Sequence, residues 1–265
     1  MPYTLNCSIL LTELPLLQRA QAAKEAGFDS VEFWWPFEQA VPSGKELDAF
    51  TASLRDAGVQ LDGLNFFAGD MPAGERGILS HPGRASEFQD NIEVVAALAE
   101  ATGCTSFNAL YGNRVDGHSH AEQDELAVEN LAAAAQAVGR TGGTVLLEPV
   151  SGVESYPLKT SADALQVIAK VKAAGAQNIA LLADFYHLAV NGDDVPAVIE
   201  AHAAEFGHIQ IADAPGRGAP GTGSLPLGEW IGRSRALGYA GKVALEYKQD
   251  RQSAFNWLAA PAANF

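Results

Sequence analysis

The sequence predicts an α/β protein folded as a single (β/α)8 TIM barrel. Short apolar runs typical of strands alternate eight times with helix-like segments, which implies parallel βαβ units. Several of the helix-like segments end in a glycine, and the length of 265 residues suits one such barrel. An open, doubly wound sheet is the alternative. No glycine-rich dinucleotide motif follows the first strand, so a closed barrel is favoured.

The individual elements follow from these patterns. The strands are expected near residues 4–9, 30–35, 61–67, 106–112, 144–150, 179–187, 208–214 and 242–248. Helical patterns rich in Ala, Leu, Glu and Lys occupy residues 15–26, 44–57, 84–102, 119–139, 161–174, 194–205, 226–237 and 252–258. The glycines expected to cap helices in the left-handed conformation are Gly27, Gly58, Gly103, Gly175 and Gly238. No linker or change of composition divides the chain, so one domain over residues 1–265 is expected.

The charge balance is acidic. The chain has 17 Lys and Arg residues against 32 Asp and Glu residues, a formal net charge of −15. Nucleic acids and anionic membranes are bound through basic surfaces, so neither is an expected partner. No apolar stretch is long enough to span a bilayer, and the apolar N-terminal segment lacks the basic leader of a signal peptide.

The two cysteines, Cys7 and Cys104, fall in separate expected strands. Neither a disulfide framework nor a thiolate zinc site is expected, and a cytoplasmic location fits. Barrels of this size often associate through their outer helices, so a homo-oligomer is a general expectation.

Polar side chains end four successive apolar runs in the second half of the chain. They are Glu148, Asp184, Gln210 and Glu246. Neighbouring strands of a barrel would bring them together at the rim where barrels build active sites, and strand alternation turns Gln210 and Glu246 inward. Carboxylates converging in an apolar setting repel one another unless a cation neutralises them. Oxygen ligands suit Mg²⁺, or alternatively Mn²⁺, so the sequence predicts a divalent-metal enzyme.

Four further residues are candidates for substrate binding. His187, at the exit of the sixth strand, is either a buried histidine bonded to the backbone or a hydrogen-bond donor to substrate. His208 is either a second such donor or part of an inner packing layer. The Gly- and Pro-rich loop 213–224 could cover the site, with Arg217 binding an anionic group bidentately. Lys248 is a second candidate for binding an anion.

The first half of the chain offers weaker signals. Arg76, in the loop 69–77, is a further candidate for anion binding. Glu32 ends the second strand, where it would orient either a substrate or another side chain. Asn6 and Asn65 lie on early strands, where an amide would contact a hydroxylated substrate or cap a loop.

Several motifs together resemble the hydroxypyruvate isomerase family, within the wider group of xylose isomerase-like barrels. They are VEFWWP (31–36), AGERGI (73–78), PGR (82–84), LEP (147–149), DFYH (184–187), HIQIADAPGR (208–217), PGTG (220–223) and LEYK (245–248). The resemblance runs from the first strand to the last. The chain departs from the family pattern at Ser151, Ala214, Ala219 and GSL (223–225), in loops expected near the far end of a substrate.

The resemblance implies a function. It assigns the metal to Glu148, Asp184, Gln210 and Glu246, and makes the two glutamates the catalytic proton donor and acceptor. The implied reaction interconverts hydroxypyruvate and 2-hydroxy-3-oxopropanoate (tartronate semialdehyde) through an enediolate. A 2-oxo-tetronate isomerase and a ketose 3-epimerase are alternatives with the same chemistry. An endonuclease IV-like hydrolase and a non-catalytic sugar-binding barrel are alternatives from other classes.

Overall fold

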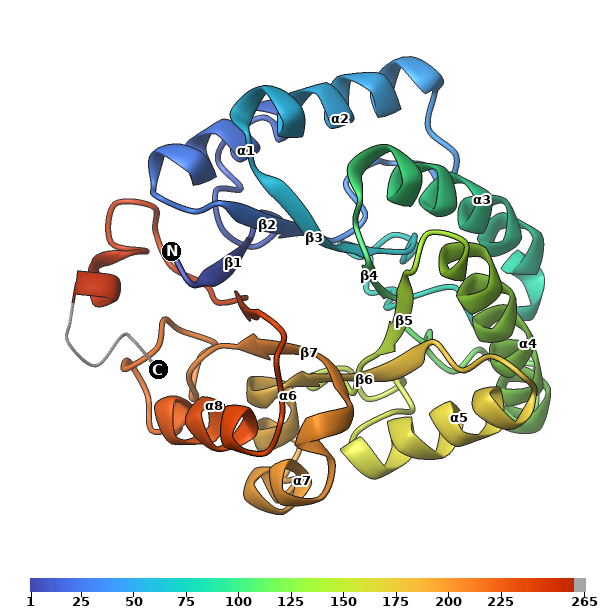
Figure 1. Cartoon of the computed structure of the whole chain (residues 1–265). Helices are drawn as coiled ribbons and strands as arrows, with labels where there is room; N and C mark the ends of the chain where they lie inside the picture. Colours follow the sequence, from blue (N-terminus) through green and yellow to red (C-terminus); the bar gives the residue numbers. More distant parts are fainter. Residues whose placement is uncertain (260–265) are drawn as a thin grey trace.

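The computed structural model describes residues 1–259 and shows eight parallel strands closed into a barrel in sequence order (Figure 1). The strands are Tyr3–Asn6 (β1), Ser30–Phe33 (β2), Gln60–Asn65 (β3), Ser106–Asn108 (β4), Thr144–Leu147 (β5), Ile179–Asp184 (β6), Phe206–Ile211 (β7) and Val243–Leu245 (β8). The first strand pairs with both β2 and β8, which closes the sheet. The predicted (β/α)8 barrel is therefore confirmed, and the open sheet is wrong.

Helices surround the barrel on its outside (Figure 1). They are Leu16–Glu25 (α1), Gly44–Ala57 (α2), Ala85–Thr102 (α3), His120–Gly139 (α4), Ser161–Ala173 (α5), Phe185–Val190 (α6), Val195–His202 (α7) and Leu227–Ala236 (α8). Short 3-10 segments occupy Pro82–Arg84, Ala203–Glu205 and Asn256–Ala259. The five glycines expected as helix caps all have positive φ. The helix expected over 252–258 is wrong, because turns and the last 3-10 segment stand there.

The expected strand 179–187 is also partly wrong, since β6 ends at Asp184 and α6 begins at the next residue. The cause is local. Oδ1 of Asp184 accepts hydrogen bonds from the backbone N–H groups of Tyr186 (2.8 Å) and His187 (3.2 Å), which caps the new helix. As a result, His187 lies on the first turn of α6 instead of continuing the strand.

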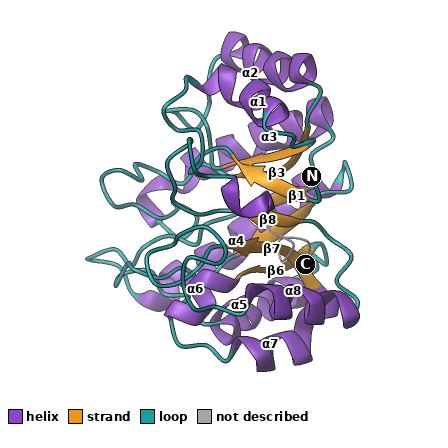
Figure 2. Ribbon diagram, turned by 90° about the vertical axis from the view of Figure 1, so that its left-hand side faces the viewer, coloured by secondary structure: helices purple, strands orange, loops and turns teal. Residues whose placement is uncertain are grey.

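The two ends of the barrel differ in the polar residues that they hold. The loops that follow the strands gather on the left-hand side of Figure 2, and the candidate site lies at that end. Near the strand starts, Asp62 accepts a hydrogen bond from Thr4 (2.7 Å) and pairs with Lys242 (2.8 Å). This second polar cluster is a structural tie between strands, distant from the site loops.

Two further expectations concern the whole chain. Both cysteines are buried and free, in agreement with the absence of a disulfide framework. Within residues 1–259, no helix is long and apolar enough to cross a membrane. The expected domain of residues 1–265 extends past the described part of the chain, and its boundaries stay a prediction.

Candidate active site

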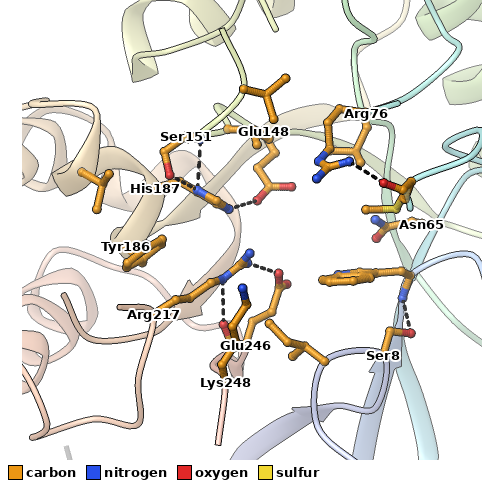
Figure 3. Close-up of a pocket in the computed structure, with 18 of the residues that line it drawn as sticks. Ser8, Asn65, Arg76, Glu148, Ser151, Tyr186, His187, Arg217, Glu246 and Lys248 are labelled. Carbon is orange, nitrogen blue, oxygen red and sulfur yellow. Dashed lines mark hydrogen bonds and ion pairs between the residues drawn. The ribbon is translucent and has the colours of Figure 1, made fainter. Parts of the chain in front are cut away.

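A cavity of about 650 Å³ opens at the carboxyl ends of the strands (Figure 3). Loops that follow β1, β3, β5, β7 and β8 contribute to its wall, and α6 contributes Tyr186 and His187. Glu148 and Glu246 line the cavity, each directly after its strand. The carboxyl ends of parallel barrel strands form the usual position of active sites in this fold.

Glu148 follows β5 and is almost completely buried. Its Oε2 accepts a hydrogen bond from Nδ2 of Asn108 at 2.7 Å, and its backbone carbonyl accepts one from the Tyr156 hydroxyl at 2.9 Å. These contacts fix both the main chain and one carboxylate oxygen. The other oxygen, Oε1, lies 3.9 Å from Nε2 of His187. Glu148 is therefore held rigidly with one oxygen directed to the site.

Asp184 and Gln210 each present one buried oxygen that has no hydrogen-bond donor. Asp184 has no exposed surface, and its Oδ2 is unpartnered while Oδ1 caps α6. Gln210 donates from Nε2 to Glu32 at 2.7 Å, and this leaves its Oε1 unpartnered. Buried polar atoms without a partner cost free energy, so these two oxygens are available to a ligand.

Glu246 follows β8, and its two oxygens have different partners. Oε2 accepts a hydrogen bond from Nδ2 of Asn6 at 3.0 Å, while Oε1 contacts Nη2 of Arg217. The same Nη2 lies 3.5 Å from Oδ2 of Asp184. The Arg217 guanidinium also lies over the Tyr186 ring, 5.6 Å from its centroid. Arg217 therefore contacts two of the predicted metal ligands, where the sequence predicted a contact with substrate.

His187 faces the carboxylates with a defined tautomer. Its Nδ1 lies 3.0 Å from the backbone N–H of Ser151, which can only donate, and 2.7 Å from the Ser151 hydroxyl. Burial lowers the pKa of His187 to about 4, so the ring is neutral and carries its proton on Nε2. That nitrogen lies 3.7 Å from Asp184 and 3.9 Å from Glu148. A protonated Nε2 donates hydrogen bonds and offers no lone pair to a metal.

His208 lies deeper in the barrel than the cavity wall. Its Nε2 is 2.8 Å from Oε2 of Glu32, whose Oε1 accepts hydrogen bonds from Asn6 (2.8 Å) and Gln210 (2.7 Å). His208 does not line the 650 Å³ cavity. This position does not support its predicted contact with substrate, and it matches the inner packing layer that the sequence left open. Glu32, by contrast, orients another side chain, since it fixes the amide of Gln210.

Burial and mutual repulsion dominate the electrostatics of the site. Burial, with a further contribution from the Asp184 charge, raises the pKa of Glu148 to about 8. Burial also raises the pKa of Glu246 well above its ordinary value, against the opposing effect of the Arg217 charge. For Arg217, burial opposes ionisation, but the Glu246 and Asp184 carboxylates outweigh it and raise its pKa. The raised pKa values mean that the buried glutamates resist ionisation in the metal-free site.

These features fit a divalent cation held by oxygen ligands. Glu148, Asp184 and His187 offer ligand-type atoms that all lie within 4.8 Å of one another. Because the Nε2 of His187 is protonated, the carboxylates are the better ligands in this group. Gln210 does not line the cavity but borders a smaller space inside the barrel with Glu32 and His208, and its unpartnered Oε1 is a neutral oxygen of the kind that Mg²⁺ and Mn²⁺ accept. The chemistry of the donor set therefore suits Mg²⁺ or Mn²⁺ better than zinc.

The Gly- and Pro-rich loop is more ordered than its composition suggests. The buried Asp213 carboxylate accepts hydrogen bonds from backbone N–H groups of Ala214, Gly221, Gly223 and Leu225, at 2.8–3.0 Å. A side chain at Gly223 would place its Cβ 2.1 Å from the Ala214 carbonyl oxygen, so glycine is required there. This folded loop carries Arg217 to the carboxylates.

The remaining residues show where sequence reasoning succeeded and where it missed a contact. Lys248 lines the cavity at its exposed rim, as expected for an anion-binding candidate. Asn108 was missed, although it ends β4 just as the predicted ligands end later strands. Ser151 was noted only as a departure from a family pattern. Its contact with His187 joins residues 36 positions apart, and no local signal indicates it.

Known proteins resemble this chain over nearly its whole length. The sequence profile described as "Xylose isomerase-like TIM barrel" matches residues 20–263. A "Putative hydroxypyruvate isomerase" of Streptomyces coelicolor is 53% identical over 98% of this chain and 96% of its own. The "Hydroxypyruvate isomerase" of Escherichia coli is 31% identical over 97% of each chain.

Two further matches define the breadth of the likeness. A "2-oxo-tetronate isomerase" of Cupriavidus necator is 32% identical over 93% of this chain and 92% of its own. The crystal structure of "AP endonuclease, family 2" from Brucella melitensis superposes with a TM-score of 0.86, at 30% identity and 98% coverage of both chains.

Proposed function

Because the chain belongs to the xylose isomerase-like TIM barrel family and is a hydroxypyruvate isomerase-like enzyme, we propose that it interconverts hydroxypyruvate and 2-hydroxy-3-oxopropanoate. The proposal rests above all on one observation. Two buried glutamates, Glu148 and Glu246, line the cavity, and Glu148 lies beside Asp184, whose Oδ2 has no hydrogen-bond donor. This arrangement suits proton transfer beside a divalent cation, Mg²⁺ or Mn²⁺.

The reaction moves one proton between neighbouring carbons. One glutamate removes a proton from C3 of hydroxypyruvate, and the resulting enediolate accepts a proton at C2 from the other glutamate. The hydroxyl proton moves from the oxygen on C3 to the oxygen on C2, so atoms and charge balance. Glu148, Asp184, Gln210 and Glu246 would hold a divalent cation, which would supply Lewis-acid chemistry that acidifies the C–H bond. The carbonyl thus ends on C3, as the aldehyde of the product.

The chain's own residues prepare this transfer. Asn108 binds one oxygen of Glu148, which leaves Oε1 of Glu148 for the cation or the substrate. Asn6 and Arg217 each bind one oxygen of Glu246, so a ligand at Glu246 would share Oε1 with Arg217. Burial raises the pKa of both glutamates, which favours proton uptake before a cation is bound. His187 presents its Nε2–H beside Glu148 and Asp184, where it donates a hydrogen bond to the negative oxygen of the enediolate.

The assigned roles are therefore as follows. Glu148, Asp184, Gln210 and Glu246 hold the cation, and the two glutamates also transfer the proton. His187 binds the substrate oxygen, and Arg217 neutralises Glu246 and Asp184 at the edge of the site. Free, buried cysteines are consistent with a cytoplasmic location, which we propose on that ground.

Turnover in deuterated water tests the proposal. The purified protein with Mg²⁺ or Mn²⁺ should incorporate deuterium at carbon from solvent into hydroxypyruvate or its product. Glu148→Gln and Glu246→Gln should each lower kcat about 10²- to 10⁴-fold, because each removes an acid–base group. Circular dichroism and thermal unfolding serve as folding controls. Unchanged rates in either variant would contradict the mechanism.

A 2-oxo-tetronate isomerase is the second candidate. The 650 Å³ cavity has more room than a three-carbon acid fills, and a relative with this name covers most of the chain. The chemistry at the carboxylates would be the same, with one more hydroxymethyl carbon in the substrate. Comparing kcat/KM for the three-carbon and four-carbon acids decides between the two. A higher value for the four-carbon acid would replace the hydroxypyruvate assignment.

A further inference from the structure

Three side chains that carry a permanent positive charge line the cavity, and they differ in how that charge is balanced. Arg217 contacts the carboxylates of Glu246 and Asp184. Lys248 lies at the exposed rim. Arg76, in the loop after β3, is half-buried and forms no ion pair with any residue in the described part of the chain. Arg76 is therefore the sheltered cation of the cavity that lacks a counter-charge.

The guanidinium of Arg76 is bound from one side only. Its Nη1 donates to the backbone carbonyls of Met71 (3.0 Å) and Glu75 (2.6 Å). Carbonyl oxygens orient a guanidinium, but they do not neutralise its charge. Within residues 1–259, Nε and Nη2 of Arg76 have no hydrogen-bond acceptor. An oriented arginine with a free donor edge is suited to bind a carboxylate through two parallel hydrogen bonds.

The glycine that follows fixes the position of Arg76 in the fold. Gly77 has a φ of 100°, and a Cβ there would lie 1.9 Å from the carbonyl oxygen of Leu110. The chain therefore crosses the loop after β4 at a distance that only glycine allows. Backbone hydrogen bonds from Gly77 to Ala68 (2.8 Å) and from Gly112 to Arg76 (3.0 Å) hold this crossing in place.

Glu75, the acidic residue next to Arg76, does not neutralise it, because the Glu75 carboxylate is already paired with another arginine. The carboxylate of Glu75 contacts Nη1 of Arg84 at 2.7–2.8 Å, and Arg84 also pairs with Glu87 at 2.6 Å. Glu75 thus points to a second cation on the far side of its own loop. Within the segment GERG (74–77), the negative charge of Glu75 is therefore used in an ion pair that stabilises the loop. The positive charge of Arg76 remains available to a ligand in the cavity.

The charge of Arg76 acts across the cavity on the reacting centre. Figure 3 shows Arg76 and His187 on opposite sides of the cavity, with Glu148 between them along its upper wall. The pKa of His187 is lowered by burial, raised by the Asp184 charge, and lowered again by the charges of Arg217 and, to the smallest extent, Arg76. A small ligand in contact with both residues would therefore bridge from the anion-binding edge to the carboxylates.

We propose that Arg76 binds the carboxylate of the substrate and gives the site its preference for hydroxy-carbonyl acids over neutral sugars. The inference rests on the proposed function and adds the orientation of the substrate. The acid group lies at Arg76, and the hydroxy-carbonyl end lies at Glu148, Glu246 and His187. Lys248, at the exposed rim, then contributes less to binding because solvent screens it.

The test compares an acid with its neutral analogue in the metal-loaded enzyme. Dihydroxyacetone has a hydroxymethyl group where hydroxypyruvate has a carboxylate. In Arg76→Gln, the KM for hydroxypyruvate should rise about 10- to 100-fold, as expected for a lost charge-assisted pair. The inhibition constant of dihydroxyacetone should stay within about threefold, since that ligand has no charge to bind. Arg76→Lys keeps the positive charge but lacks the two parallel donors of the guanidinium, so it should give an intermediate KM.

The ratio of these two constants is independent of the fraction of active enzyme, so partial misfolding does not imitate the effect. Arg55→Gln, which removes an exposed arginine on α2, is the matched control and should change neither constant. An equal rise of both constants in Arg76→Gln would overturn the inference. So would an acid-selective loss in Lys248→Gln with none in Arg76→Gln.

Failure of the inference is distinct from failure of the proposed function. If the wild-type protein converts hydroxypyruvate and Arg76→Gln leaves its KM unchanged, only the role of Arg76 is wrong. If the wild type converts the four-carbon 2-oxo acid instead, the same selectivity is measured with that acid and its neutral analogue. If it converts no hydroxy-carbonyl acid, both proposals fail.

Discussion

Two polar layers lie one above the other inside this barrel, and they contrast in how their carboxylates are satisfied. In the lower layer, Glu32 accepts hydrogen bonds or close contacts from Asn6, Gln210 and His208, so both of its oxygens have partners. In the upper layer, Oδ2 of Asp184 has no hydrogen-bond donor, and Glu148 has a pKa raised to about 8. The layers are joined by Gln210, which donates downward and leaves its oxygen free.

This contrast distinguishes buried carboxylates that stabilise the structure from buried carboxylates that are available for chemistry. A buried carboxylate with all of its hydrogen bonds made is a stable part of the structure. Buried carboxylates with raised pKa values resist ionisation, and we propose that a divalent cation at this cluster stabilises their charged form. We therefore propose that the lower layer orients ligands and that the upper layer binds the cation and reacts. Three predictions test this division.

The largest effect is expected from Asp184→Asn in the upper layer. The asparagine oxygen still caps α6, so the fold should be retained, but a negative ligand is lost. The affinity for Mn²⁺, measured by isothermal titration calorimetry, should fall by more than about 100-fold, beyond the usual effect of an outer contact. Unaltered Mn²⁺ affinity with a folded variant would show that the cation, if any, binds elsewhere.

A smaller loss is expected from Glu32→Gln in the lower layer. The new amide brings a donor against Asn6, Gln210 and His208, so the Gln210 amide loses its fixed orientation. Mn²⁺ affinity should fall about 10- to 100-fold, as is typical when a contact that orients a ligand is removed.

Asp62→Asn is the matched control for Glu32→Gln, because it removes a carboxylate near the strand starts, away from the site. Its Mn²⁺ affinity should equal that of the wild type. Equal losses in the two variants would mean that Glu32 acts through general stability and not through Gln210.

The smallest effect is a pH dependence of stability in the metal-free protein. Glu148 has a pKa of about 8 when folded and 4.5 ordinarily, so the folded state binds more protons and stability falls as pH rises. His187, with a pKa of about 4 against 6.5, acts in the opposite direction but only below pH 6.5. Between pH 6.5 and 8, denaturation in EDTA should therefore show a loss of stability on the order of 1 kcal/mol from Glu148.

Glu148→Gln isolates this contribution, since glutamine does not titrate. The variant should lose less stability than the wild type between pH 6.5 and 8, and saturating Mn²⁺ should offset the loss in the wild type at pH 8. A wild-type protein that gains stability over this interval would contradict the raised pKa.

Sequence patterns were sufficient for much of the molecule. Alternating apolar runs and glycine caps such as Gly58 and Gly103 predicted the barrel, because these signals are local and periodic. The same patterns failed after residue 184, where a single aspartate ends a strand and caps a helix at once. They also failed at 252–258, where helical composition was not followed by helical structure.

The candidate site divides in the same way. Residue type and strand position alone indicated Glu148, Asp184, Gln210 and Glu246, since strand ends of a barrel meet at one rim. The partners of those residues did not follow from type or position. Asn108, Ser151 and Glu32 act through contacts between distant segments, and His208 was placed below the cavity by its contact with Glu32.

The sequence by itself thus determined the barrel and the set of acidic residues at its rim, because both arise from short-range periodicity and chain order. Only the tertiary structure decided which nitrogen of His187 carries the proton, which oxygen of Gln210 stays free and which arginine keeps an unbalanced charge. Those properties depend on hydrogen bonds between side chains from different strands and loops. These side chains come within hydrogen-bonding distance only when the complete barrel has folded.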